Sequence, residues 1–180
     1  RRLSNERHGK LNKRIKMIIQ DNFLPKKQFK EIKAVIENYH FPWYWNDQRD
    51  YDIESVKKKI GQFQLTHTFF RDSNKSNWFN SLDPIINKIQ PKALIRIKAN
   101  LNPYSQQLLI GEYHIDQSFD CGASIFYINT NNGYTSFKKE NEKVKSVANR
   151  LVTFKANELH LGTNCTDCKK RIVINFNYFK

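Results

Sequence analysis

The sequence contains one set of residues whose types and spacing suit a metal centre. His114 and Asp116 are separated by a single residue, and His160 follows further along the chain. Two imidazoles and one carboxylate can occupy one face of an octahedral Fe(II) ion and leave the other positions open for substrate and oxygen. Residues i and i+2 of a strand point to the same side, so a strand at His114–Asp116 would let both bind one ion. His160 must then come from another strand, and Arg171 can pair with the far carboxylate of a keto-acid cosubstrate.

The His-x-Asp pair is a weak signal when it is taken alone. With the five His and nine Asp of this chain, chance gives about a quarter of an occurrence. The complete set in this order, with a basic partner downstream, is much less expected by chance. For His114 considered without the other residues, a half-buried structural histidine is the alternative interpretation.

Four stretches of the second half carry a family resemblance. They are YHID (113–116), SIFYINTNNGYTSF (124–137), VANRLVTFKANELHLGT (147–163) and RIVINFNYF (171–179). Together they resemble the catalytic core of the 2-oxoglutarate/Fe(II)-dependent oxygenases, in particular the prolyl-4-hydroxylase-like branch in the short single-domain form of phages and marine microbes. The first half is similar only loosely, through FPWYW (41–45), the stretch around His67, and LIRIKANL (94–101).

The resemblance implies a role for each residue of the set. His114, Asp116 and His160 would hold Fe(II), and Arg171 would bind the C5 carboxylate of 2-oxoglutarate. Tyr127, which precedes Ile-Asn at the end of an expected strand, would share that carboxylate. The cofactors implied are Fe(II), 2-oxoglutarate as cosubstrate and O2, with ascorbate as a stimulating reductant.

The reaction implied is hydroxylation of a C–H bond, with release of succinate and CO2. Related halogenases lack the metal-binding carboxylate, so the presence of Asp116 favours hydroxylation. A peptidyl proline or a related peptide or small molecule is the expected substrate, and Asn100, Asn175 and His67 are expected to line the cleft. For His67, a partly buried structural role is the preferred interpretation, and cleft lining is the alternative.

The charge of the chain keeps a second substrate class open. Formal net charge is +14, with +7 in residues 1–60 and +7 in residues 61–180. Clustered Lys and Arg would favour nucleic acid, and a nucleic-acid base oxygenase, which must extract its base from the stack, is the first alternative. Such enzymes carry a second arginine six residues after the first, where this chain has Asn177. Lys, Asn and Ile make up a third of the residues, so coding bias also explains the charge. A non-catalytic jelly-roll binding module is the second alternative.

The pattern of apolar residues predicts a mainly β fold with flanking helices. We expect one domain over 1–180, with a helical and strand support over 1–92 and a double-stranded β-helix (jelly-roll, cupin-like) catalytic core over 93–180. Helical spacing occurs at Lys26–Asn38 and Asn77–Ile89, where Pro84 kinks the helix or marks its start. Strands are expected before the second helix at Ile15–Ile19 and Gly61–Phe70, and after it at Ala93–Asn100, Leu108–Asp116, Ala123–Asn129, Tyr134–Phe137, Val144–Val147, Arg150–Phe154 and Arg171–Phe179.

Cysteine usage and hydropathy bound the location. Three cysteines are too few for a disulfide scaffold, which favours a reducing, cytoplasmic setting. No apolar run is long enough to span a bilayer, so no membrane partner is expected. Cys165-x-x-Cys168 has half the spacing of a zinc ribbon but no second pair, so a polar loop is the preferred interpretation and zinc the alternative.

Overall fold

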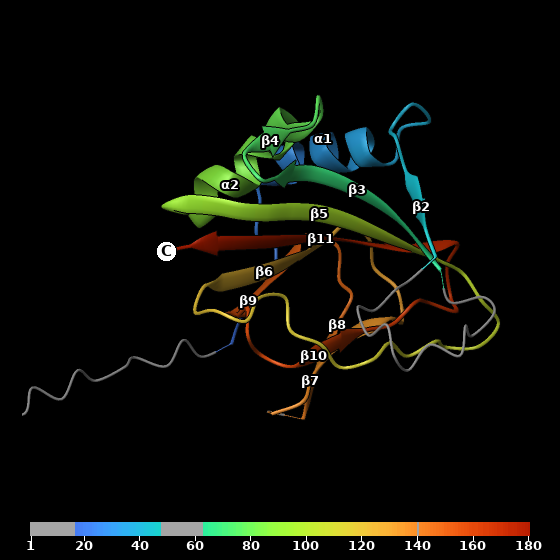
Figure 1. Cartoon of the computed structure of the whole chain (residues 1–180). Helices are drawn as coiled ribbons and strands as arrows, with labels where there is room; N and C mark the ends of the chain where they lie inside the picture. The colour runs from blue at the N-terminus through green and yellow to red at the C-terminus, as the bar shows by residue number, and fades with distance from the viewer. Residues whose placement is uncertain (1–16, 48–62, 140) are drawn as a thin grey trace, which may run out of the picture.

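Two antiparallel sheets face each other, and short helices cover the outer face of the larger one (Figure 1). The computed structural model describes residues 17–47, 63–139 and 141–180. The main sheet contains β1 (Ile18–Gln20), β9 (Arg150–Lys155), β6 (Gly122–Tyr127), β11 (Lys170–Phe179), β5 (Ala93–Pro103), β3 (Gln64–Arg71) and β2 (Tyr44–Asn46) in that order, with β4 (Asn74–Lys75) paired to β3. The small sheet has the order β10 (His160–Gly162), β7 (Tyr134–Phe137), β8 (Glu142–Lys145). The helices are α1 (Lys26–Ile36), the 3-10 turn η1 (Phe79–Leu82) and α2 (Asp83–Ile89).

The main sheet has two different faces because its strands alternate in polarity. On β11, Ile172, Ile174, Phe176 and Tyr178 all belong to the core formed with the helices, together with Ile32, Ile36, Leu82 and Ile85. Val173 belongs to a second core between the two sheets, with Tyr127, Phe137 and Phe154. The polar residues of β11 therefore face the space between the sheets, as expected for a strand with period two.

The jelly-roll-like, mainly β fold expected from the sequence is confirmed. The strand predicted at Tyr134–Phe137 has the same bounds in the structure, and Pro84 marks the start of α2 rather than a kink. Segments before residue 92 extend the main sheet as well as supporting it, because β1 pairs with β9 and β3 with β5. The predicted strand starts at 15–16 and 61–62 lie outside the described residues.

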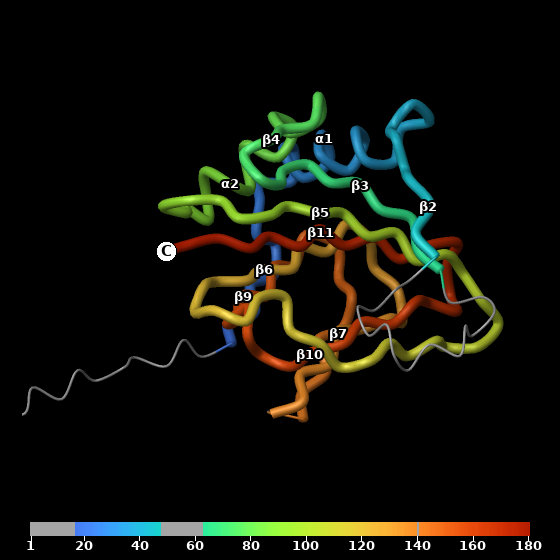
Figure 2. The backbone as a smooth tube through the Cα atoms, viewed as in Figure 1, coloured from blue at the N-terminus to red at the C-terminus, as the bar shows by residue number. Residues whose placement is uncertain are grey.

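The strand predicted at Leu108–Asp116 is wrong. This segment is an extended connection that forms isolated bridges only, between Ile110 and Thr163 and between His114 and His160. Figure 2 shows it as the yellow-green tube after β5, passing beside β10. Its partner β10 contains only three residues, which is too short to support a continuous ladder. The chain nevertheless delivers His114 and Asp116 to one place.

Neither described helix has the length and apolarity to cross a membrane. Cys121, Cys165 and Cys168 are all free thiols. The reducing, cytoplasmic setting stays a prediction.

Candidate metal centre and cosubstrate site

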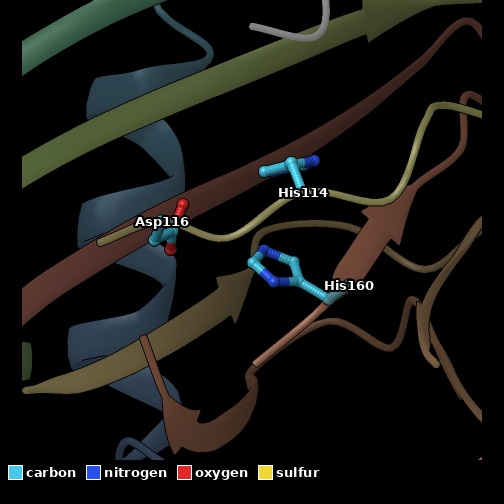
Figure 3. Close-up of side chains that lie close together, drawn as sticks. All are labelled: His114, Asp116 and His160. Atoms are coloured by element: carbon cyan, nitrogen blue, oxygen red, sulfur yellow. The ribbon is translucent and has the colours of Figure 1, made fainter. Parts of the chain in front are cut away.

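His114, Asp116 and His160 lie together between the two sheets, and their side chains point toward one another (Figure 3). One ligand atom from each residue lies within 4.8 Å of the others. A reciprocal pair of backbone hydrogen bonds places the histidines side by side: His114 N donates to His160 O at 2.9 Å, and His160 N donates to His114 O at 3.0 Å. Asp116 is held two residues further on, where its N–H donates to Ala156 O at 2.9 Å. The three residues therefore form a pre-arranged group that can hold a metal ion.

Both histidines have Nδ1 held by a backbone carbonyl oxygen. The Nδ1 atom of His114 is 3.1 Å from Glu112 O, and that of His160 is 2.9 Å from Glu158 O. A carbonyl oxygen only accepts hydrogen bonds, so each Nδ1 carries the proton. A ligating histidine is commonly oriented in this way, by donating its other ring N–H to a carbonyl or carboxylate. In the neutral form of each ring, Nε2 is then the unprotonated nitrogen.

The carboxylate of Asp116 is held by two residues of the main sheet. Arg96 Nη2 donates to Oδ1 at 3.2 Å, and Asn177 Nδ2 donates to Oδ2 at 3.0 Å. Arg96 Nε also donates to Asn177 Oδ1 at 3.2 Å, and the two residues are opposite each other on β5 and β11. The sheet therefore fixes the plane of the carboxylate.

The electrostatics of the group favour the protonation states that metal binding requires. Burial raises the pKa of Asp116, but the charges of His160 and Arg96 and the hydrogen bond from Asn177 outweigh it, so the net pKa is below its usual value. Burial lowers the pKa of His160, although the Asp116 charge acts in the opposite direction. An ionised carboxylate and a neutral imidazole are the ligand forms that bind metals. The donor set therefore fits a divalent ion such as Fe(II).

A cavity opens from this group toward the start of β11. It has about 60 Å³ of space for the centres of water-sized groups, several times the roughly 10–15 Å³ that one water needs. Arg96, Lys98 and Arg171 line it, against one carboxylate, that of Asp116. With a divalent cation added, the lining would be strongly positive, and it therefore favours an anionic ligand.

Arg171 lies in the wall of this cavity with 2% of its surface exposed. Its Nε donates to Ser146 Oγ at 2.7 Å and its Nη1 to Thr163 O at 3.1 Å. Nη2 donates to Thr135 Oγ1 at 3.1 Å. A Cβ atom on Gly133 would lie 2.6 Å from Arg171 Cδ, so the turn after β6 needs glycine to let the side chain pass. The guanidinium is thus fixed before any ligand arrives.

Tyr127 packs against Arg171 but is not among the residues that line the cavity. The guanidinium carbon lies 5.7 Å from the centre of the tyrosine ring, and the hydroxyl donates to Thr135 Oγ1 at 2.8 Å. Burial raises the pKa of Tyr127, with the charge of Arg171 acting the other way. Thr135 Oγ1 accepts hydrogen bonds from Tyr127 and Arg171, and Thr135 lines the cavity. Tyr127 is therefore connected to the cavity through Thr135.

The residues expected in the cleft divide into two groups. Asn100 and Asn175 line the cavity. The placement of His67 there is wrong, because His67 faces the helices: its Nδ1 is 2.9 Å from Pro42 O, its Nε2 is 3.0 Å from Ser76 Oγ, and its ring packs on Phe41 and Phe69. Alternation along β3 puts His67 on the apolar side of the sheet.

Cys165 and Cys168 lie in the loop between β10 and β11, with their sulfurs 3.5 Å apart and the Asp167 carboxylate nearby. Cys168 Sγ donates to Lys170 O at 3.0 Å. Burial, together with Cys168, raises the pKa of Cys165 to about 12. Among the described residues this loop offers three ligand atoms, from Cys165, Asp167 and Cys168, where a structural zinc site uses four, which favours the polar-loop interpretation over zinc.

Comparison with solved structures gives the fold a family context. A prolyl hydroxylase from Trichoplax adhaerens, in complex with a hypoxia-inducible factor peptide, matches with a TM-score of 0.62 at 15% identity, over 91% of this chain and 83% of that one. A viral collagen prolyl hydroxylase from Paramecium bursaria Chlorella virus-1, in complex with 2-oxoglutarate, matches with a TM-score of 0.57 at 15% identity, over 91% and 96%. The fold is that of the 2-oxoglutarate/Fe(II) oxygenases.

Other matches show that this oxygenase fold is used for more than one reaction. The non-haem α-ketoglutarate-dependent epimerase SnoN of nogalamycin biosynthesis has a TM-score of 0.65 at 10% identity, over 91% of this chain and 77% of that one. No protein-family model and no curated protein matched the sequence. At these identities the comparison defines the architecture, and the chemistry has to be argued from the site.

Three residues of the site were not predicted from the sequence: Arg96, Thr135 and the bonding role of Asn177. The alternation Arg171, Val173, Asn175, Asn177 already places Asn177 on the cavity face of β11. Arg96 has the same two-residue spacing relative to Lys98 and Asn100 on β5. For Thr135 the sequence contains no distinguishing signal, because a threonine in a strand is common.

Proposed function

We propose that this protein is an Fe(II)- and 2-oxoglutarate-dependent dioxygenase that hydroxylates a C–H bond and releases succinate and CO2. One observation carries the proposal: the group His114, Asp116 and His160 lies at a cavity whose wall contains the buried guanidinium of Arg171. Two prolyl hydroxylases, one of them in complex with 2-oxoglutarate, share the fold, which supports the proposal.

In this proposal the metal is held by Nε2 of His114, Nε2 of His160 and the carboxylate of Asp116. When bound, Fe(II) with 2-oxoglutarate and O2 supplies the oxidising power for the reaction. The protein's own part is to fix these three ligands through Glu112 O, Glu158 O, Arg96 and Asn177. Both aromatic neighbours of His160, Phe137 and Phe154, restrict its ring to one orientation.

The cosubstrate is held by Arg171 and Thr135. A planar guanidinium matches a carboxylate with paired hydrogen bonds, and its position is set by Ser146 and Thr163. Thr135 Oγ1 accepts from Tyr127 and Arg171, so its own hydroxyl proton is the donor for the ligand. Tyr127 then acts by orienting Thr135 and packing on Arg171. Burial of the anchor excludes water and strengthens the pairing.

The substrate proposed is a peptide containing proline, or a related molecule. Two observations support this proposal. The two prolyl hydroxylases above share the architecture, and the sequence stretches of the core resemble the prolyl-4-hydroxylase-like branch. Asp116 supports hydroxylation because it fills the position that a halide would need. Ascorbate is expected to stimulate turnover.

A nucleic-acid base is the second candidate, supported by the net charge of +14. The position of the second arginine of base-repair oxygenases is taken here by Asn177, which is bonded to the metal-ligand carboxylate. A binding curve against salt tests this candidate, since neutralised phosphates give a steep dependence.

The test is succinate release by the Fe(II)-loaded protein across proline peptides, free amino acids and oligonucleotides. We expect 2-oxoglutarate turnover without substrate and stimulation above that rate by a proline peptide. Stimulation by an oligonucleotide alone would favour the base oxygenase. Absence of turnover with Fe(II), 2-oxoglutarate and O2 under all conditions would contradict the enzymatic proposal and favour a binding module.

A further inference from the structure

Cys165 and Cys168 form a pair of thiols outside the metal and cosubstrate site. Their sulfurs lie 3.5 Å apart, and neither is among the described residues that line the cavity at Arg171. A disulfide joins its sulfurs at about 2.0 Å, so the two sulfurs would have to approach by roughly 1.5 Å. Thr166 and Asp167 between them form a bend rather than a strand. No ladder of strand hydrogen bonds therefore opposes this movement.

The two thiols differ in their access to solvent. Cys168 is partly exposed and lines a surface hollow together with Tyr104 and Lys169. The hollow has about 390 Å³ of space for the centres of water-sized groups, which admits a small oxidant. Cys165 lies behind it and is 0% exposed. A redox-sensitive cysteine is accessible and often lies next to a second, resolving cysteine, so Cys168 fits the first role and Cys165 the second.

The bonding of each sulfur agrees with these roles. Asn129 Nδ2 is a donor 3.7 Å from Cys168 Sγ, so an N–H faces this sulfur when the thiol proton leaves. Burial, followed by the hydrogen bond and charge of Cys168, raises the pKa of Cys165 to about 12. Cys165 is therefore the protonated partner. Oxidation of Cys168 to a neutral sulfenic acid removes the contribution of its charge.

On one side of the pair, the backbone bonds lead directly to the cosubstrate anchor. Lys170 O, in the residue before Arg171, accepts from Cys168 Sγ at 3.0 Å and from Asn129 Nδ2 at 2.7 Å. Asn129 Oδ1 accepts from Ile172 N, in the residue after Arg171, at 2.9 Å. Forming a disulfide removes the thiol proton and with it one of the two donors to Lys170 O. The backbone at Arg171 is thus held differently in the two redox states.

On the other side, the pair is connected to the guanidinium itself. Thr163 comes two residues before Cys165, and its carbonyl oxygen accepts from Arg171 Nη1 at 3.1 Å. Cys165 Sγ donates to Cys168 O at 3.3 Å, a bond that a disulfide also removes. The loop therefore begins and ends at the anchor, and a disulfide within it changes the bonds between these ends.

We propose that Cys165 and Cys168 form a reversible oxidation site, and that their disulfide weakens the binding of 2-oxoglutarate at Arg171. The oxidation does not depend on the proposed function, whereas its effect on 2-oxoglutarate rests on that function. The oxidant is a hydroperoxide, and a dithiol reductant reverses the reaction.

The oxidation takes place in two steps. The Cys168 thiolate attacks one peroxide oxygen, the O–O bond breaks, and the other oxygen leaves as hydroxide or alkoxide, which produces a sulfenic acid on Cys168. The sulfur of Cys165 then attacks Cys168 Sγ and breaks the S–O bond, and the leaving hydroxide combines with the Cys165 thiol proton as water. Two electrons pass from the two thiols to the peroxide.

The first measurement is the intact mass of the full chain after treatment with hydrogen peroxide. Metal is removed beforehand, because Fe(II) reacts with peroxide. We expect the wild type to lose two hydrogens and a dithiol to restore them. Cys165→Ser should instead gain an oxygen on Cys168, which a sulfenic-acid reagent traps, and Cys168→Ser should show neither change. Cys121→Ala, at a cysteine buried between the sheets, is the matched control and should oxidise like the wild type.

The second measurement is the Kd of 2-oxoglutarate for the reduced and the oxidised wild type. Catalase removes the peroxide, Mn(II) is added as the metal, and 2-oxoglutarate is titrated calorimetrically. We expect the Kd to rise about fivefold on oxidation, the effect of one lost hydrogen bond, and to return on reduction. Cys168→Ser should give the same Kd before and after peroxide. The comparison of two states of the wild type does not depend on the folding of any variant.

Absence of a disulfide in the wild type, or the same loss of hydrogens in Cys168→Ser, would overturn the inference. A disulfide that leaves the Kd unchanged would overturn it as well, because the loop would then have no influence on the anchor. A reduced protein that binds no 2-oxoglutarate would contradict the proposed function together with this effect. The mass measurement identifies that case, since it uses no cosubstrate.

Discussion

Two buried histidines lie on opposite faces of the main sheet, and their surroundings differ in one respect. His67 is 3% exposed and His160 is 2% exposed, and each has Nδ1 next to a backbone carbonyl. His67 Nε2 is bonded to Ser76 Oγ on the helix side. His160 has its second nitrogen directed at His114 and Asp116 (Figure 3).

Burial therefore does not separate a structural histidine from a metal ligand. Burial lowers the pKa of both side chains, and both pack on phenylalanine rings. The difference is whether the protein itself satisfies the second nitrogen. A histidine whose partners are all within the fold contributes to stability, and one with a nitrogen aimed at other ligand atoms contributes to a site.

The largest effect on activity is expected from substitutions of the candidate metal ligands. His114→Ala or Asp116→Ala should abolish Fe(II)-dependent decarboxylation of 2-oxoglutarate, because each removes one of three ligands. The fold should remain, since both residues border an open cavity, and circular dichroism checks this. Near-normal turnover in either variant would contradict the assignment of His114, Asp116 and His160 as the metal ligands. Mn(II), Co(II) or Ni(II) should bind the wild type without supporting turnover, since such sites discriminate poorly by affinity.

The next effect concerns Arg171, the buried cation of the same face. Arg171→Ala should weaken 2-oxoglutarate binding by one to three orders of magnitude, because losing a bidentate partner of a buried carboxylate costs about 2–5 kcal/mol, at about 1.4 kcal/mol per tenfold. Calorimetric titration of 2-oxoglutarate into the metal-loaded protein measures this. Lys169→Ala and Lys170→Ala are controls that should change the Kd little. If a lysine variant loses binding and Arg171→Ala does not, the anchor is misassigned.

A smaller effect is expected at Thr135, which joins Tyr127 to Arg171. Valine has the same shape but cannot accept from either residue, and hydrogen bonds to charged groups contribute about 1.5–3 kcal/mol. Thr135→Val should raise the Kd of 2-oxoglutarate about tenfold. Thr166→Val, which removes a hydroxyl bonded to Asn132, should leave it unchanged. An unaltered Kd in Thr135→Val would place the cosubstrate away from this wall.

The smallest effect on activity belongs to His67, and its effect on stability depends on pH. Burial holds the pKa of His67 below its usual 6.5, against the hydrogen bond to Pro42. The unfolded chain therefore binds a proton that the folded chain resists, and the free energy of unfolding falls as pH drops below about 6.5. His67→Asn should reduce that loss between pH 7.5 and 5.5 in urea unfolding, while 2-oxoglutarate turnover at pH 7.5 is unchanged. Turnover that falls with this variant would show that the two faces are coupled.

The grouping of His114, Asp116 and His160 with Arg171 was predicted from residue types and order, and the structure brings these side chains to one cavity. Period-two alternation on the last strand placed Arg171 and Asn175 toward a cavity and Ile172 and Ile174 toward a core, and the structure agrees. Tyr134–Phe137 was recognisable because Asn131-Asn132-Gly133 marks the turn before it, where Gly133 N donates to Asn131 Oδ1. Local chemistry and local geometry coincide at these positions.

Other features depend on pairings that a single sequence does not display. The bond between Arg96 and Asp116 joins residues that meet only after β5 and β11 are paired. The sequence left cleft lining open for His67 because its partners Pro42 and Ser76 come from loops. The segment before Asp116 has the residue pattern of a strand. It forms isolated bridges only, because its neighbour β10 contains three residues.

The pairing of β11 with β5 also fixes the spacing between two parts of the site. Arg171 lies opposite Asn102 and Asn177 opposite Arg96 without a break in register between them, a separation of six residues or about 20 Å along the strand. The interval between the guanidinium and the carboxylate support is therefore set by counting residues, and no loop can adjust it. One residue inserted between them would turn Asn177 toward the helices, whereas two would keep its face and lengthen the interval by about 7 Å. The spacing between the proposed cosubstrate anchor and the support of Asp116 is thus fixed by one strand.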